Sequence, residues 1–99
     1  MTKEEVLKAI INLFKKINAV DPNFTQTELK KVKMNDLAWF QMDFGLDDDL
    51  KKEILFKMLE ACITNLNNGV QPVIEPADFT LFNYPQTIEE TADMISTYS

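Results

Sequence analysis

The chain of 99 residues contains no histidine, no arginine and only one cysteine. Without histidine, the sequence lacks the usual general base near neutral pH, most zinc sites, and both Ser-His and Cys-His catalysis. Without arginine, no side chain can hold a phosphate or carboxylate in the bidentate manner. The single cysteine, Cys62, excludes an internal disulfide, and its place on the apolar side of a predicted helix favours a buried thiol over a nucleophile.

Glycine and proline are also scarce, with two and four residues. So few turn formers argue against an all-β fold with many tight turns, and against disorder. The hydrophobic content of 45% and charged content of 26% are ordinary for a soluble globular chain, and the length suits a single domain. No long apolar run or signal pattern is present, so we expect a cytoplasmic protein without a membrane partner.

The net charge is −6, which argues against a nucleic-acid partner because phosphate binding needs a basic face. The charge is unevenly distributed along the chain. Residues 1–34 carry seven lysines and four acids, a net charge of +3, whereas residues 35–99 carry three lysines and twelve acids, a net charge of −9. Any partner that responds to charge therefore meets an acidic C-terminal two-thirds.

Three capping boxes, each a threonine followed three residues later by a glutamate, indicate helix starts. They are Thr2 with Glu5, Thr25 with Glu28, and Thr87 with Glu90. The first precedes apolar residues at helical spacing, which predicts an amphipathic helix ending near Asn18. Residues 21–46 show no clean period, and we expect one or two short helices there with Trp39 and Phe40 turned inward.

The longest predicted helix runs from about Asp48 to Leu66. Its apolar residues recur at helical spacing, led by the series Leu50, Ile54, Met58 and Ala61 and widened by Leu55, Leu59, Cys62, Ile63 and Leu66. Residues 67–69 end it, since Gly69 readily takes the left-handed conformation. A short helix is expected over residues 76–82. The sequence therefore predicts one all-α domain over residues 1–99, a bundle of three main helices and one short helix.

An acidic loop precedes this long helix and contains Gly45, which permits backbone angles closed to other residues. Asp47, Asp48 and Asp49 follow at the predicted helix start. An aspartate there can cap the free backbone N–H groups, and its charge is favoured at the positive end of the helix dipole. We expect Asp48 to be the capping residue, with its two neighbours as the other candidates.

The carboxylates of this loop raise the alternative of a metal binder or a small acidic-loop enzyme. Counted from Asp43, however, the sixth residue is Asp48 rather than glycine and the twelfth is Ile54 rather than glutamate, so the loop is not an EF-hand. A paired-carboxylate hydrolase needs an apolar pocket that raises one pKa, and a solvated helix start has the opposite effect. We therefore expect no catalytic residue, no metal ligand and no enzymatic activity.

The segment from Phe40 to Asp48, Phe-Gln-Met-Asp-Phe-Gly-Leu-Asp-Asp, resembles the Phe-x-x-Asp-Leu-Gly-Leu/Ala-Asp-Ser segment of acyl carrier proteins. Residues 53–54 match the Glu-Leu pair that follows in that family. Residues 74–76 resemble the start of its third helix, and residues 87–95 resemble its closing Thr-Val-x-x-x-x-Asp-x-Ile pattern. The resemblance implies the acyl-carrier type of helical bundle, with insertions before Phe40 and around residues 65–73.

In that family a serine opens the second helix and carries the phosphopantetheine arm. The corresponding residue here is Asp48, which cannot accept the arm as a stable phosphodiester. The resemblance therefore implies a non-enzymatic, carrier-like interaction module that holds no phosphopantetheine or other cofactor. Two explanations of Asp48 stay open, a permanent mimic of the charge of the modified state and a helix cap that replaced a lost serine.

Acyl carrier proteins offer an acidic face around the second helix to basic patches on biosynthetic enzymes, which speeds docking. The resemblance implies the same partner-binding use for Asp47, Asp49 and Glu53, in a monomeric or weakly associating chain. Three lysines on the same predicted helix alter that surface. The alternative is an accessory component of an acyl or peptidyl synthase, in fatty acid, polyketide or related biosynthesis, where another protein carries the acyl group.

Overall fold

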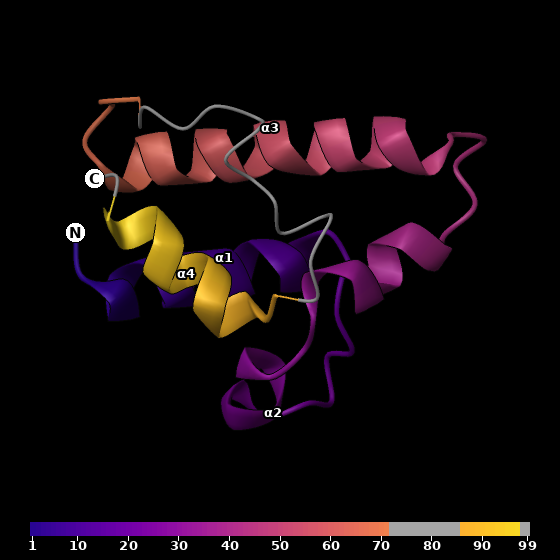
Figure 1. Ribbon diagram of the computed structural model, residues 1–99, viewed down its shortest axis with the longest axis horizontal. Coiled ribbons are helices and arrows are strands. Elements are labelled where there is room, and N and C mark those ends of the chain that lie inside the picture. Colours follow the sequence, from indigo (N-terminus) through magenta and orange to yellow (C-terminus); the bar gives the residue numbers. More distant parts are fainter. Residues whose placement is uncertain (72–85, 98–99) are drawn as a thin grey trace.

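The computed structural model describes residues 1–71 and 86–97, and within these ranges it contains helices and no strand (Figure 1). The predicted all-α fold is confirmed. The elements, in chain order, are α1 (Lys3–Lys16), α2 (Gln26–Lys30), the 3-10 helices η1 (Met34–Asp36) and η2 (Ala38–Gln41), α3 (Asp48–Leu66) and α4 (Ile88–Thr97). The short helix expected over residues 76–82 lies outside the described residues.

Helix α1 lies at the centre of the packing and contacts both α3 and α4. Figure 1 shows α1 and α3 running in opposite directions, with α4 beside α1 and the short helix α2 at the opposite end of the molecule from α3. One face of α1 therefore has to be apolar along its whole length. Leu7, Ile10 and Phe14 are fully buried at intervals of three and four residues, which confirms the predicted amphipathic helix.

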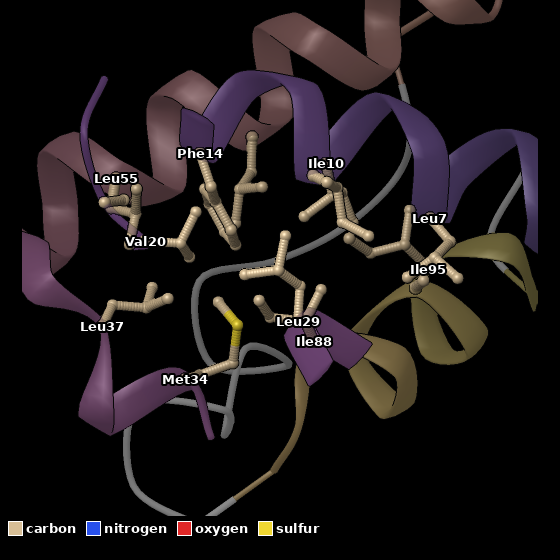
Figure 2. Packing of buried hydrophobic residues seen from close by; sticks show 14 of the residues in the cluster. Leu7, Ile10, Phe14, Val20, Leu29, Met34, Leu37, Leu55, Ile88 and Ile95 are labelled. Carbon is tan, nitrogen blue, oxygen red and sulfur yellow. The ribbon is translucent and has the colours of Figure 1, made fainter. Parts of the chain in front are cut away.

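Every other element adds side chains to the core built on α1 (Figure 2). They include Leu29 from α2, Met34 from η1, Trp39 from η2, Leu55 and Leu59 from α3, and Ile88 and Ile95 from α4. Trp39 is 8% exposed, so its predicted inward orientation is confirmed, and Phe40 is half-buried against the same core. The irregular region between α1 and α3 is thus fixed by its apolar side chains rather than by regular helix.

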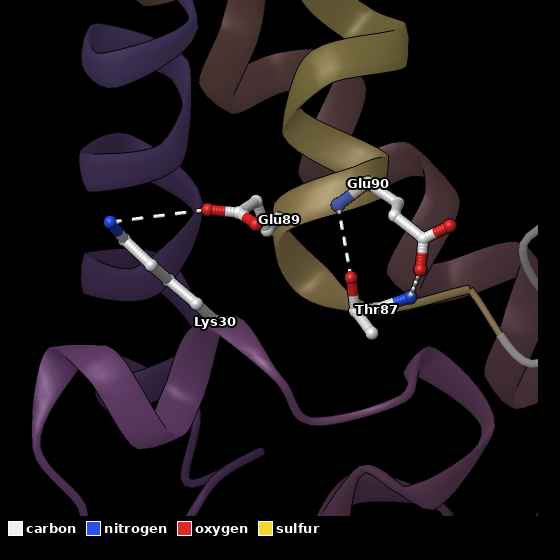
Figure 3. Close-up of polar contacts among 4 residues, drawn as sticks. All are labelled: Lys30, Thr87, Glu89 and Glu90. Carbon is white, nitrogen blue, oxygen red and sulfur yellow. Dashed lines mark hydrogen bonds and ion pairs between the residues drawn. The ribbon is translucent and has the colours of Figure 1, made fainter.

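All three predicted capping boxes form. At the start of α4 the Glu90 backbone N–H donates to the Thr87 hydroxyl at 3.1 Å, and the Thr87 N–H donates to the Glu90 carboxylate at 3.1 Å (Figure 3). In the first box, hydrogen bonds from the backbone and side chain of Thr2 lower the pKa of Glu5. These local pairs explain why the helix starts were predictable from sequence.

Helix α4 is fastened to the region between α1 and α3 at its first turn. The Met34 N–H donates to the Gln86 carbonyl at 2.6 Å, and the Ile88 N–H donates to the Val32 carbonyl at 2.9 Å. A salt bridge of 4.0 Å joins Lys30 of α2 to Glu89 of α4 (Figure 3). Since both side chains of this ion pair are partly exposed, the backbone bonds contribute most of the attachment.

Helix α3 has its predicted bounds but a different buried face. Its fully buried apolar residues are Leu55, Leu59 and Ile63, with Phe56 at 8% exposure. The series that leads the prediction lies on the flank instead: Leu50 is 40% exposed, Ile54 and Met58 are half-buried, and Ala61 is exposed. The leading series is therefore wrong as the core face, because two neighbouring apolar stripes share this helix and α1 covers only one.

Candidate functional site

The acidic loop before α3 is a defined turn. Gly45 has a φ of 70°, and its N–H donates to the Asp43 carboxylate at 3.0 Å. A side chain at Gly45 would meet no neighbour but would have to adopt the left-handed conformation that L-residues rarely take. The turn therefore depends on the backbone freedom of glycine and directs the chain into the helix start.

The residue that caps α3 is Asp47, and the prediction that Asp48 is the cap is wrong by one position. The Leu50 N–H donates to the Asp47 carboxylate at 2.8 Å. Asp47 still has extended backbone angles, whereas Asp48 is the first helical residue and its exposed carboxylate lies in the first turn. Asp48 can therefore contribute charge at the positive end of the helix dipole, but it does not make the capping hydrogen bond.

The structure brings the predicted site residues together at one end of α3. Asp47, Asp48 and Asp49 are consecutive and solvent-exposed, and Glu53 follows one turn later on the same helix. Glu53 forms an ion pair of 3.6 Å with Lys57, with 60% and 71% of the two side chains exposed. We refer to the surface made by Asp43, Asp47, Asp48, Asp49 and Glu53 as the acidic end of α3.

A buried lysine holds the loop against this helix, and the sequence analysis did not find it. Lys51 is 5% exposed, and its ammonium donates to the carbonyls of Phe40 at 3.0 Å and Met42 at 2.5 Å. The Trp39 indole N–H donates in return to the Lys51 carbonyl at 3.3 Å. One sequence signal could have identified it, since Lys51 lies four and eight residues before Leu55 and Leu59 and so shares their face.

Phe44 completes the contacts of the loop. Its ring lies 4.9 Å from the Trp39 ring, and the Lys51 ammonium is 5.9 Å from its centroid. Phe44 nevertheless stays 47% exposed, and Leu50 nearby in sequence stays 40% exposed. The acidic end of α3 thus displays apolar side chains among its carboxylates, on a loop held by aromatic, cation–π and hydrogen-bonding contacts.

No known protein identifies this chain. Protein-family models, curated proteins and solved structures were compared with it, and none matches. The likeness to acyl carrier proteins accordingly stays a prediction that rests on the sequence motifs. Over residues 1–71 and 86–97, no group of three or more cysteine or acidic side chains is arranged to hold a metal ion. In the same ranges no helix combines the length and apolar character needed to cross a membrane.

A groove of about 450 Å³ lies between α1 and α3, away from the acidic loop. Its lining residues are Ala9, Asn12, Leu13 and Lys16 from α1, and Met58, Ala61, Cys62 and Asn65 from α3. The Cys62 thiol donates a hydrogen bond to the Ala9 carbonyl at 3.7 Å, and partial burial raises the pKa of this thiol. Cys62 is therefore held as a neutral thiol, which disfavours a nucleophilic role.

Proposed function

We propose that this chain is a carrier-like, non-enzymatic interaction module of the cytoplasm that docks a protein partner through the acidic end of α3. The observation that supports this proposal most directly is the exposure of all five carboxylates on one fixed helix end. Opposite charge on the partner would steer the encounter and set its orientation. A basic patch surrounding a small apolar pocket suits this surface, because Phe44 and Leu50 are exposed beside the carboxylates.

The rigidity of the loop supports docking as well. Lys51 and Trp39 bind the loop backbone and the helix backbone to each other, so the carboxylates are presented with little freedom before a partner arrives. A surface that is already ordered loses less conformational entropy on binding. The same contacts give the loop no enclosed apolar pocket for an acidic catalyst, which favours a binding role over an enzymatic one.

The acyl-carrier resemblance enters the proposal through the order of elements. A long first helix, a long connection, a second helix opening at Asp48 and a last helix opening after Thr87 agree with what the resemblance implies. Asp48 is exposed at the first position of α3, where the family has its modified serine. With a carboxylate there, we expect the module to act without a phosphopantetheine arm. An accessory component of an acyl or peptidyl synthase is the specific variant of this proposal.

A test with a phosphopantetheinyl transferase separates these possibilities. Incubation of the wild-type chain with coenzyme A and a broad-specificity transferase is expected to leave its mass unchanged, because the chain has no hydroxyl at position 48. The variant Asp48→Ser restores a hydroxyl at the same place on the exposed helix start. If the module is carrier-like, this variant gains the mass of one phosphopantetheine arm.

The same reaction tests the docking surface. In the Asp48→Ser background, Asp49→Asn and Glu53→Gln should each slow modification, and higher salt should slow it further, because the transferase is attracted to the acidic end of α3. Glu4→Gln is the matched control, since it removes one exposed carboxylate from the start of α1. An Asp48→Ser chain that folds but is never modified, or that is slowed equally by the control, would contradict the proposal.

A further inference from the structure

The flank of α3 carries an apolar stripe that no part of the described chain covers completely. Leu50, Ile54, Met58 and Ala61 follow one another at intervals of four, four and three residues, so they lie on one side of the helix. Leu50 is 40% exposed and Ala61 is also exposed, while the two residues between them are half-buried. A helix that is apolar on two neighbouring sides is expected to be buried on both. We call these four residues the outer stripe.

The two ends of the outer stripe have complementary shapes. At its N-terminal end Leu50 projects into solvent. At its C-terminal end Met58 and Ala61 form part of the groove between α1 and α3, together with Leu13 and Cys62. A projection and a hollow at opposite ends of one helix are brought together when a second copy binds in the antiparallel orientation about a two-fold axis.

The charges beside the outer stripe favour the same orientation. Glu53 and Lys57 lie next to each other along one edge of the stripe, 3.6 Å apart and largely exposed. In an antiparallel pair the same edges of both helices meet with reversed direction, so Glu53 of each copy faces Lys57 of the other. Charges along the edges of a helical interface set partner choice and orientation. Lys16 in the groove wall adds attraction toward the acidic start of the opposing α3.

We propose that the outer stripe is a homodimer interface, in which α3 of one copy packs antiparallel against α3 of a second copy. An axis passing between Ile54 and Met58 places Leu50 of each copy opposite Cys62 of the other, at the groove. The contact is one helix wide and therefore small, so the association is weak and concentration-dependent. This surface is separate in kind from the proposed docking of a basic partner and does not depend on it.

Charge reversal provides the first test, by sedimentation equilibrium from micromolar to millimolar concentration. Glu53→Lys and Lys57→Glu should each weaken self-association about tenfold, because both facing pairs become repulsive. An equimolar mixture of the two variants should associate again, since every facing pair is then complementary. Glu4→Lys and Lys31→Glu are the matched controls, with the same changes at exposed positions away from the stripe. A wild type that stays monomeric throughout, or a mixture that does not recover, overturns the proposal.

Cross-linking provides the second test and fixes the register. In Leu50→Cys, mild oxidation should join position 50 of one copy to Cys62 of another and give a covalent dimer. Within one chain these positions are twelve residues apart on α3, about 18 Å, too far for a disulfide. Asn68→Cys, an exposed substitution beyond the helix end, should give no such product. Peptide mapping that finds position 50 joined to itself, or equal dimer from the control, would overturn the proposed packing.

Discussion

At the scale of single residues, three adjacent aspartates show how one position changes a role. Each can cap a helix by its chemistry, and the sequence analysis chose Asp48. The backbone decides otherwise, since Asp47 has φ −76° and ψ 168° and is the last residue outside the helix. Its carboxylate then reaches the Leu50 N–H at 2.8 Å. The choice depends on where the Gly45 turn delivers the chain, which residue chemistry alone does not specify.

Substitutions at the two positions should therefore differ in their effect on stability. Asp47→Ala removes the capping hydrogen bond and should lower the free energy of unfolding by about 0.5–2 kcal/mol. Asp48→Ala removes only a charge near the dipole, about 0.3–1 kcal/mol at an exposed site. Asp47→Asn keeps a capping oxygen and should retain most of the stability. Urea denaturation of the three variants measures the order, and a greater loss from Asp48→Ala than from Asp47→Ala would contradict the assignment of the cap.

At the scale of elements, the connection between η2 and α3 depends on Lys51. A charged side chain on the buried face of a helix is costly unless its donors are satisfied. Here the ammonium lies on the Phe40 and Met42 carbonyls, which end the short helix η2. Lys51 therefore links two elements that share few other polar contacts, and it sets the position of the acidic loop.

Replacing this lysine should loosen that connection. Lys51→Met keeps the apolar stem but leaves the two carbonyls without their donor, a loss expected to cost about 1–3 kcal/mol. Hydrogen exchange should show weaker protection of α3 near its first turns, since the loop no longer braces them. Lys52→Met is the matched control on the neighbouring position, which is half-buried but not on the core face. Equal stability of the two variants would show that the ammonium contributes nothing to the attachment.

At the scale of the whole molecule, one core joins all the described elements, so unfolding should be a single cooperative transition. Trp39 reports on the region between α1 and α3, because it is 8% exposed and its indole binds the Lys51 carbonyl. Tryptophan emission should shift to longer wavelength at the same urea concentration at which the helical circular dichroism is lost. An earlier tryptophan transition would mean that the loop before α3 unfolds separately from the helices.

Much of the architecture was predictable because it depends on contacts within a few residues. The capping boxes, the bounds of α3 and the left-handed Asn68 and Gly69 that follow it all depend on local hydrogen bonds and backbone preferences. The acidic residues of the candidate site were likewise predictable as a cluster, because they are close in sequence. The short helices α2, η1 and η2 were foreseen only in outline, since their side chains follow no helical period.

The sequence by itself therefore determined the helices, their ends and the acidic character of the loop before α3. Only the tertiary structure decided which side of α3 faces α1, which aspartate caps it, and that Lys51 is buried. These features depend on residues far apart along the chain, such as the packing of α1 against α3 and the Phe40 and Met42 carbonyls beside Lys51. A helix with two apolar stripes satisfies the local pattern in either orientation, and the choice is made by the surface against which it packs.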